Sequence, residues 1–339
     1  MNASPLSFAP AWHAAGYASA ATPRRADPAT LQQIGGQTMG TTWSLRFDNP
    51  RMVPLDGVRS AVEAALARVI RQMSHWEADS DLSRYNGAAA GSVHALAPEF
   101  AKVMACALQW ADASDGALDP TVAPLVSLWG FGPRGDANAR VPSPELLRAA
   151  RGACGWRRLG FNAADATLQQ PGGLTLDLSG IAKGFAVDHV VEALRALALE
   201  NLLVEIGGEL RGEGRRPDGG PWTVQVDGLS QTVALEDAAV ATSGDRWHRR
   251  EQNGRRWSHT IDPRTGEPVD HPLASVTVLH RECMQADALA TVLMVLGPND
   301  GLAFADAHGI AALFLERASD EAVARASRAW AGRTQATHA

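Results

Sequence analysis

A short apolar run in the middle of the chain leads through a turn of small residues into a long amphipathic stretch. The run covers residues 174–178, the turn is Ser179-Gly180, and the amphipathic stretch extends from about residue 181 to 199. Its apolar positions recur every three or four residues, which is the period of a helix with one buried face. The order strand, turn and helix aims backbone N–H groups at an anion bound before the helix. The chain is therefore expected to pack helices against strands.

Strand-like alternation and helix-like periodicity also occur along the rest of the chain. Residues 41–47 alternate in polarity as a half-buried strand does, with Trp43, Leu45 and Phe47 on one face. Further strands are predicted at residues 202–206, 222–226, 257–261 and 275–279, and further helices at about 56–73, 98–111 and 283–296. The sequence holds no internal repeat and no clean linker. We therefore predict an α+β fold in which helices lie on mostly antiparallel sheets.

Composition argues against several classes of protein. A hydrophobic fraction of 45% with 20% charged residues is typical of a folded chain, and no run of eighteen apolar residues predicts a transmembrane span. The net charge of −6 and the lack of a Lys/Arg-rich face argue against a nucleic-acid partner. Residues 1–33 lack the basic start and apolar core of a signal peptide, so we expect a disordered leader there. Two intimately joined lobes over residues 34–320 and a tail over 321–339 complete the expected organisation.

Asp287 and Thr291 stand four residues apart in the predicted helix 283–296. Residues at this spacing lie on one helix face about a turn apart, so a carboxylate and a hydroxyl converge there. Oxygen donors of this kind suit Mg²⁺, which commonly takes only one or two carboxylates besides phosphates and carbonyls. The same pair is also typical of a solvated helix edge or a cap. Spacing alone therefore leaves metal binding as one of two interpretations.

Other polar residues stand next to turns where a ligand could approach the backbone. His259 precedes the tight turn of residues 262–266, and an imidazole held there could serve as a general base. Lys183 follows the Ser179-Gly180 turn, where an ammonium and backbone N–H groups could hold a phosphate. The glycine-rich surface loop of residues 112–140 and the glycine turns near residues 207 and 244 could admit a flat ligand. Each of these segments is also compatible with ordinary packing.

Seven segments, taken together and in this order, resemble the FAD:protein FMN transferase family, also called ApbE. They are Met39-Gly40-Thr41-Thr42, Asp119-Pro120-Thr121-Val122, residues 176–188 (LDLSGIAKGFAVD), residues 205–209 (EIGGE), residues 241–244 (ATSG), residues 259–266 (HTIDPRTG) and residues 286–291 (ADALAT). The resemblance spans roughly residues 35–315. One such turn carries little weight, but seven in register make chance agreement improbable.

The resemblance implies a T-fold-like architecture and a specific reaction. The reaction is Mg²⁺-dependent transfer of the FMN half of FAD to a Ser or Thr hydroxyl of an acceptor protein, with release of AMP. The resemblance implies that Asp287, Thr291 and the backbone carbonyl of Gly180 ligate Mg²⁺, and that His259 is the base. The residues that it places along the FAD cleft are Met39, Asp119, Lys183, Glu209 and Ser243. The implied acceptor is a membrane redox subunit, a reductase or a flavin-bearing regulator.

Some features depart from the family pattern or leave alternatives open. Trp43 and Trp76 stand where the family often has Tyr or Phe, which keeps a flat apolar surface but removes a hydroxyl. Family members are commonly periplasmic lipoproteins of the inner membrane, whereas no lipobox cysteine precedes Cys106. The sequence as it stands is compatible with the cytoplasm, and an incomplete leader is the alternative. Two rival functions fit the same residues: an FAD pyrophosphatase, in which water replaces the acceptor, and a protein that binds FAD without turnover.

Overall fold

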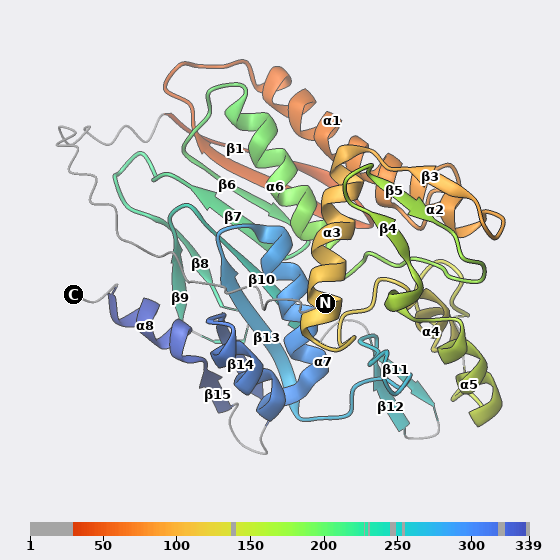
Figure 1. Ribbon diagram of the computed structural model, residues 1–339. Coiled ribbons are helices and arrows are strands. Elements are labelled where there is room, and N and C mark those ends of the chain that lie inside the picture. Colours follow the sequence, from red (N-terminus) through yellow and green to blue (C-terminus); the bar gives the residue numbers. More distant parts are fainter. Residues whose placement is uncertain are drawn as a thin grey trace, which may run out of the picture.

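The computed structural model describes residues 30–136, 140–226, 228–229, 231–244, 249–252, 255–317 and 323–336. Over these residues, eight strands form one sheet through the middle of the molecule (Figure 1). In spatial order they are β1 (Leu31–Thr38), β2 (Thr41–Asp48), β6 (Leu202–Ile206), β7 (Glu209–Glu213), β10 (Ala238–Gly244), β13 (Leu273–His280), β14 (Ala311–Glu316) and β15 (Val323–Ala326). Each strand is antiparallel to its neighbours. The predicted α+β fold with antiparallel sheets is confirmed.

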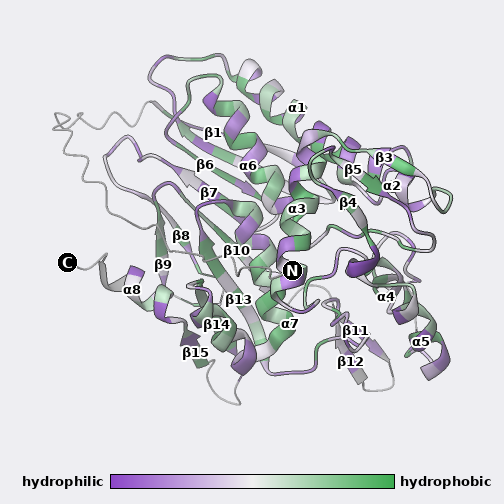
Figure 2. Ribbon diagram, in the orientation of Figure 1, coloured by the Kyte–Doolittle hydropathy of each residue, from purple (hydrophilic) through white to green (hydrophobic). Residues whose placement is uncertain are grey.

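Helices cover one face of this sheet. Helix α6 (Ala182–Arg195) lies over β6 and β7, and α7 (Cys283–Ala307) lies over β10 and β13 (Figure 1). Helix α1 (Leu55–Met73) packs beside α6, and α3 (Pro98–Ala113) packs against α7. Figure 2 shows α7 and the strands beneath it as mainly hydrophobic. The main core therefore lies between these helices and the sheet, where apolar side chains are removed from water.

A third layer covers the opposite face. The hairpin of β8 (Trp222–Gln225) and β9 (Thr232–Leu235), together with α8 (Arg328–Ala336), forms this layer. Trp222 and Trp330 are buried there against Leu203 and Leu313. Because both faces of the central strands are covered, most residues of β6, β13 and β14 are buried, including Ser275 and Thr277, and not only every second one.

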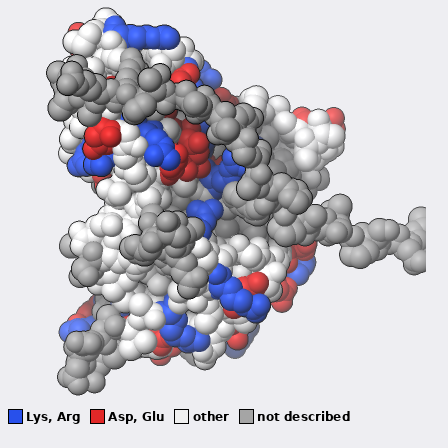
Figure 3. All heavy atoms as spheres, turned by 90° about the vertical axis from the view of Figure 1, so that its left-hand side faces the viewer, with Lys and Arg blue, Asp and Glu red and all other residues white. Residues whose placement is uncertain are grey.

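Smaller elements lie beside α3 and next to the lower end of α7 in Figure 1. They are α2 (Asp81–Asn86), β3 (Val93–Ala95), α4 (Ala123–Leu128), α5 (Pro144–Gly152), the 3-10 helix η2 (Trp156–Arg158), β4 (Gly160–Asn162), β5 (Thr167–Gln169), β11 (Arg249–Gln252) and β12 (Arg255–Ser258). Trp129 at the end of α4 and Trp257 of β12 are buried with their ring centroids 5.9 Å apart. This contact ties the β11–β12 hairpin to α4. On the side of the molecule shown in Figure 3, acidic and basic side chains are interspersed.

The predicted strand at residues 174–178 is wrong. Its backbone is extended and its leucines are buried in alternation, but within the described residues it joins no ladder. The side-chain amide of Asn86 bonds instead to both backbone groups of Leu176, at 2.6 and 3.0 Å. The Asp177 N–H donates to the carbonyl of Pro120 at 2.8 Å. An isolated extended segment can thus satisfy its buried backbone groups without a neighbouring strand.

Helix α7 breaks where the sequence predicts its end. Gly297 has a φ of +82°, and Pro298 follows it, so the first segment stops there and a second one continues to Ala307. A residue with positive φ followed by proline is a common helix stop. Among the described helices, α7 is the one that length and apolar composition would allow to cross a membrane. Those properties also belong to a core helix, and α7 packs on β10, β13 and α6.

The expected boundaries of the folded body need correction at both ends. Strand β1 begins at Leu31 and pairs with β2, so residues 31–33 of the expected leader belong to the sheet. Residues 1–29 lie outside the described residues. At the other end, the expected tail contains β15, which pairs with β14, and α8, which buries Trp330. Both edge strands are mostly not buried, β1 with the sequence LQQIGGQT and β15 with VARA, so neither shows the regular apolar face from which strands are predicted.

The glycine-rich segment of residues 112–140 is only partly the predicted surface loop. Residues 116–121 are buried, and α4 lies within the segment. Thr121 shows why burial is possible there: its hydroxyl accepts a hydrogen bond from the Gly155 N–H at 2.7 Å and donates to Asp119 at 2.6 Å. Side chains within the segment thus satisfy the polar groups that a buried loop would otherwise leave unpaired.

Candidate active site

A cavity of about 410 Å³ opens where several turns and strand ends meet helix α7. We call it the acidic cavity, because Asp119, Asp177, Glu209 and Asp287 line it beside the single ammonium of Lys183. Eight of the residues singled out in the sequence line it: Asp119, Gly180, Lys183, Glu209, Ser243, His259, Asp287 and Thr291. They come from segments spread over more than half of the chain. The fold therefore collects in one place the residues that the resemblance had grouped.

Met39 lies in an adjoining cavity of about 670 Å³. We call this the apolar cavity, because Val69, Ile70 and Met73 of α1 form one of its walls. Met39 has a φ of +47° in the tight turn between β1 and β2, and Trp76, with 68% of its surface exposed, is also part of the lining. The two cavities share Ser179, Lys183 and Gly207, so they meet at this edge.

Asp287 is held by a close crossing of α6 and α7. Its Oδ2 accepts a hydrogen bond from the Gly184 N–H at 2.8 Å, and the residue is 6% exposed. A Cβ at position 184 would lie 2.3 Å from the Cys283 carbonyl oxygen, so only glycine permits this approach. Burial raises the pKa of the Asp287 carboxyl, whereas the charge of Lys183 and the Gly184 N–H act in the opposite direction.

Oxygen atoms of three residues converge beside Asp287. Thr291 lies one helical turn after Asp287, and its Oγ1 donates to the Gly180 carbonyl at 3.5 Å. Within the described residues no side chain hydrogen-bonds to Oδ1 of Asp287. A carboxylate, a hydroxyl and a carbonyl are the donor set that a hard divalent cation prefers. The described residues hold no cluster of three His, Cys, Asp or Glu, so such a cation would need further ligands from a substrate.

Lys183 and Glu209 form an ion pair in the same cavity, in which the Glu209 side chain is 5% exposed and the Lys183 side chain 33% exposed. Glu209 starts β7 after the Gly207-Gly208 turn, in which both glycines have positive φ. Its second oxygen, Oε2, is buried and has no hydrogen-bond partner among the described residues. Burial and the nearby charge of Asp287 raise the pKa of Glu209 to about 8, although Lys183 acts to lower it. The carboxylates of Glu209 and Asp287 thus share the ammonium of Lys183. The remaining negative charge favours binding of a cation or a proton in the cavity.

His259 was predicted to lie within a strand at residues 257–261. Strand β12 ends at Ser258, so His259 lies directly after it. Its ring meets Phe131 edge-on with centroids 6.2 Å apart. The following turn is tightly closed, because the Gly266 N–H donates to the Asp262 carbonyl at 2.7 Å. The Val269 N–H donates to the Thr260 carbonyl at 3.0 Å and holds the returning chain next to His259. The imidazole is therefore carried on a rigid turn at the cavity wall.

Asp119 contributes to the cavity mainly by fixing the loop that surrounds it. Its Oδ1 accepts from the Thr121 N–H at 2.7 Å and from the Thr121 hydroxyl, and its Oδ2 accepts from the Trp156 N–H at 3.3 Å. Burial raises the pKa of this carboxyl in spite of those hydrogen bonds. Ser243 lies near the end of β10, one residue after Thr242, whose hydroxyl lies 2.9 Å from that of Thr277.

Asp177 is a cavity residue that sequence reasoning missed. Its Oδ1 accepts from the Ser179 N–H at 2.8 Å, and His75 lies 3.8 Å from the same oxygen. The available signal was the Asp-x-Ser spacing, which is typical of an Asx turn. That turn orients the Ser179-Gly180 corner, and with it the carbonyl of Gly180.

Comparisons with known proteins agree with this geometry. Residues 39–314 match the model of the ApbE family. The FAD:protein FMN transferase of Vibrio cholerae is 38% identical over 301 residues, which are 86% of this chain and 90% of that protein. The one from Haemophilus influenzae is 37% identical over 311 residues, covering 88% of this chain and 90% of that protein.

Solved structures show the same architecture. The crystal structure of the apo form of Pseudomonas stutzeri flavinyl transferase ApbE matches with a TM-score of 0.84 and 40% identity, covering 89% of this chain and 96% of that one. The flavin transferase ApbE from Vibrio cholerae matches with a TM-score of 0.83 and 37% identity, covering 89% of this chain and 99% of that one.

Proposed function

The chain belongs to the ApbE family, and we propose on that basis that it transfers the FMN half of FAD to another protein. The observation that carries the proposal is a single cavity that joins the oxygen donors Asp287, Thr291 and Gly180 to the imidazole of His259. Binding FAD alone would require no base within reach of a reacting hydroxyl. The arrangement therefore supports catalysis in preference to storage of the nucleotide.

The reaction exchanges the phosphoanhydride link of FAD for a phosphoester link to the acceptor. The hydroxyl oxygen of an acceptor Ser or Thr attacks the FMN phosphorus, the bond from that phosphorus to the bridging oxygen breaks, and AMP leaves with the bridging oxygen. The hydroxyl proton passes to His259, because a free hydroxyl is a weak nucleophile and needs a base beside it. The rigid turn after β12 holds the imidazole for this step, and the acceptor's own docking supplies the alignment.

We propose that Mg²⁺ is held by Asp287, Thr291 and the carbonyl of Gly180. When bound, it would supply positive charge to the diphosphate oxygens as the leaving group becomes more negative. Lys183 adds a fixed positive charge next to Glu209, so we assign it to a phosphate of FAD. Met39, Asp119, Glu209 and Ser243 are proposed to line the rest of the FAD site.

The test is transfer to an acceptor domain with a defined Ser or Thr, in the presence of FAD and Mg²⁺. Protein-bound flavin fluorescence after denaturation and the intact mass of the acceptor are measured. The control is the same acceptor with that Ser or Thr replaced by Ala. We expect FMN on the first acceptor, none on the second, and none on either when the metal is chelated.

The other outcomes identify the rival functions. Free FMN and AMP with no labelled acceptor would show an FAD pyrophosphatase, in which water takes the acceptor's place. Unchanged FAD would show a flavin-binding protein without turnover. Candidate acceptors for the screen are membrane redox subunits, reductases and flavin-bearing regulators.

A further inference from the structure

The N-terminus of helix α7 is capped by a side chain from another helix. Its own N-cap residue, Glu282, makes no side-chain capping hydrogen bond. Instead, Asp188 of α6 accepts hydrogen bonds from the Cys283 N–H at its Oδ1 and from the Met284 N–H at its Oδ2, both at 2.9 Å. The first N–H groups of a helix have no partner within it, and a carboxylate there is favoured by the helix dipole. Asp188 therefore anchors the start of the helix that carries Asp287 and Thr291.

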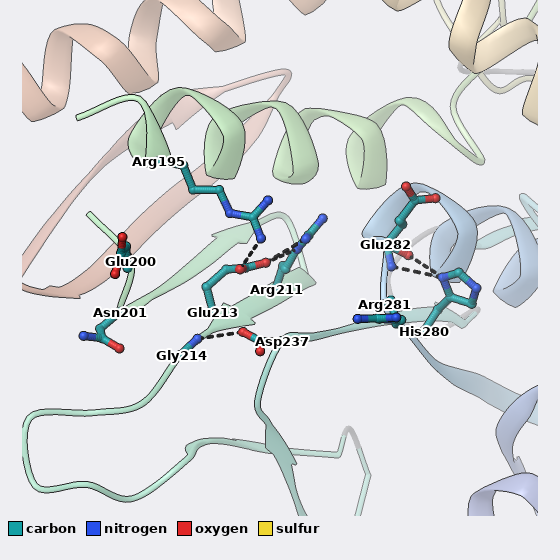
Figure 4. Close-up of a pocket in the computed structure, with 10 residues that line it drawn as sticks. All are labelled: Arg195, Glu200, Asn201, Arg211, Glu213, Gly214, Asp237, His280, Arg281 and Glu282. Carbon is teal, nitrogen blue, oxygen red and sulfur yellow. Dashed lines mark hydrogen bonds and ion pairs between the residues drawn. The ribbon is translucent and has the colours of Figure 1, made fainter. Parts of the chain in front are cut away.

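Asp188 is itself fixed by a buried arginine. Arg211 of β7 donates from Nη1 to Oδ1 of Asp188 at 2.5 Å and from Nε to Glu213 at 2.7 Å. Asp188 is 3% exposed, so its charge depends on this partner. Figure 4 shows the outer part of the network, in which Arg195 reaches from α6 to the carboxylate of Glu213 beside Arg211. These residues line a polar cavity of about 880 Å³ that is separate from the acidic cavity.

The network repeats the contacts of the active site one helical turn away. Gly184 and Asp188 are four residues apart on α6, and Cys283 and Asp287 are four residues apart on α7. The Gly184 N–H bonds to Asp287, and Asp188 bonds to the Cys283 N–H, so two successive turns of the helices are tied together. The absence of a Cβ at Gly184 allows the helices to approach this closely. A shift of the Asp188–Cys283 hydrogen bond will therefore displace the Gly184–Asp287 hydrogen bond.

Helix α6 and strand β7 are likewise linked by two successive contacts. Lys183 pairs with Glu209 in the acidic cavity, and Asp188 pairs with Arg211, which is two residues further along the strand. Residues two apart in a strand lie on one face of the sheet, so both pairs stand between α6 and β7. Asp188 and Arg211 are absent from the lining of the acidic cavity. They can therefore act on the site only indirectly, and the hydrogen bonds of Asp188 to Cys283 and Met284 direct that effect to α7, the helix that carries Asp287.

We propose that Asp188, held by Arg211, is a positioning residue that sets the place of Asp287 and Thr291 for binding a divalent cation. The inference rests on the proposed function, because it takes those two residues to be metal ligands. Residues that orient metal ligands without touching the metal typically change metal affinity about 10- to 100-fold when replaced. The step affected is the binding of the cation and not the transfer of the proton to His259.

The test compares Asp188→Asn with the wild-type protein in a Mg²⁺ titration of FMN transfer, at saturating FAD and acceptor. Asn keeps the size of Asp but offers one acceptor oxygen where two N–H groups need one each. We expect half-saturating Mg²⁺ to rise about 10- to 100-fold, while the rate at saturating Mg²⁺ changes less than about threefold. A loss of fold alone would lower the amount of active protein without moving the Mg²⁺ midpoint.

Arg195→Gln is the matched control, since it removes a charge from the same network but leaves the Asp188–Arg211 contact in place. Its Mg²⁺ midpoint should equal that of the wild type. If Asp188→Asn does not fold, Arg211→Gln is measured instead, because it keeps the cap and removes only the group that holds it. The same increase in the Mg²⁺ midpoint is expected.

The outcomes separate this inference from the proposed function. A wild-type protein that transfers FMN with a clear Mg²⁺ midpoint, and a folded Asp188→Asn variant with the same midpoint, would overturn the positioning role alone. A wild-type protein whose transfer ignores Mg²⁺ would overturn the metal assignment and the inference together. Isothermal titration of the FAD-bound protein with Mg²⁺, without an acceptor, gives the same comparison without the transfer step.

Discussion

At the scale of single residues, Asp287 is the clearest case of a group placed at a cost to stability. Its carboxylate is nearly fully buried, and among the residues that the structure describes it is compensated by one backbone N–H and the nearby charge of Lys183. Burying a charge with so little hydrogen bonding is unfavourable unless the group serves another purpose. A cation that binds only the folded protein would offset this cost by mass action.

Replacing Asp287 by Asn should therefore separate stability from activity. The side chain keeps its shape, and its oxygen can still accept the Gly184 N–H. We expect an unchanged or higher melting temperature without metal, and a loss of Mg²⁺-dependent FMN transfer of more than about 100-fold, because several kcal/mol of charge stabilisation disappear. Thr291→Ser, which keeps the hydroxyl, is the control for Thr291→Val, which removes it. Normal transfer by Asp287→Asn would contradict the metal assignment.

Glu209 provides a prediction about pH. Its pKa of about 8 in the folded protein lies above the usual value near 4.5, so the folded state holds an extra proton between those two pH values. Stability must then fall as pH rises through this window, with the penalty complete above pH 8. Glu209→Gln removes the titrating group and leaves Lys183 with Asp287. The melting temperature of the variant relative to wild type should increase between pH 5 and pH 8, by about 2 °C or more, since each pKa unit is worth about 1.4 kcal/mol.

Residue spacing alone could identify only part of the site. The pair Asp287 and Thr291 follows from helical periodicity, because both positions belong to one element. Glu209 and His259 come from a turn and a strand end far from that helix, and no local pattern reports that they share a cavity with it. Their assignment came from the family resemblance, and the fold brings them together. Asp188 was missed because its role lies in contacts with another helix, whereas Asp177 had a local signal, the Asp-x-Ser spacing, that the prediction did not use.

At the scale of elements, α7 shows how sequence and tertiary contacts combine. Gly297-Pro298 predicts the break correctly, because glycine accepts a positive φ and proline cannot continue the hydrogen bonding. Pro298 has no N–H to donate to the Met294 carbonyl, and the Nε2 of His271 lies 2.7 Å from that oxygen. The residues just before β13 are thereby attached to α7. By contrast, the extended segment 174–178 was mistaken for a strand, because its alternation reports burial and not pairing.

Substitution of Gly297 tests the break. A Cβ there would lie 3.2 Å from the His271 ring, in addition to the strain of a φ of +82°. Gly309→Ala is a matched control, because that glycine also has a positive φ but no atom lies within 4 Å of the added Cβ. Strain should lower the free energy of unfolding by about 1–2 kcal/mol in both variants. Gly297→Ala should lose about 1 kcal/mol more, measured by urea denaturation. Equal losses would show that the His271 contact carries no weight.

At the scale of the whole molecule, the sheet is covered on both faces, and the second cover comes partly from the C-terminal segment. Residues 323–336 were expected to be a tail, yet β15 extends the sheet and α8 closes the third layer. Strand β15 pairs with the nearby β14, whereas Trp330 of α8 lies in one apolar cluster with Leu203 and Trp222, which are distant in sequence. Composition and periodicity could therefore predict the fold class and, of the eight strands of the central sheet, β2, β6 and β13, but not this closure.

The closure makes Trp330 a test of global stability. The side chain is almost fully buried, and it packs with Trp222, Leu313 and Leu279 on the face of the sheet opposite the site. Trp330→Ala should lower the free energy of unfolding by about 3–5 kcal/mol. Trp76→Ala, at a position that is 68% exposed, should change it by less than about 0.5 kcal/mol. FMN transfer by Trp330→Ala below its melting temperature should stay close to wild type. A similar effect of both substitutions would mean that α8 contributes little.

The two cavities that meet along Ser179, Lys183 and Gly207 have a consequence for selectivity. A molecule that fills both cavities has to pass these three shared residues, so a ligand of fixed length places the same bond beside them each time it binds. The shape of the two cavities then determines which bond of the ligand is presented for cleavage. A nucleotide too short to extend from one cavity into the other would bind in one of them and would not be cleaved, whatever the reactivity of its phosphates.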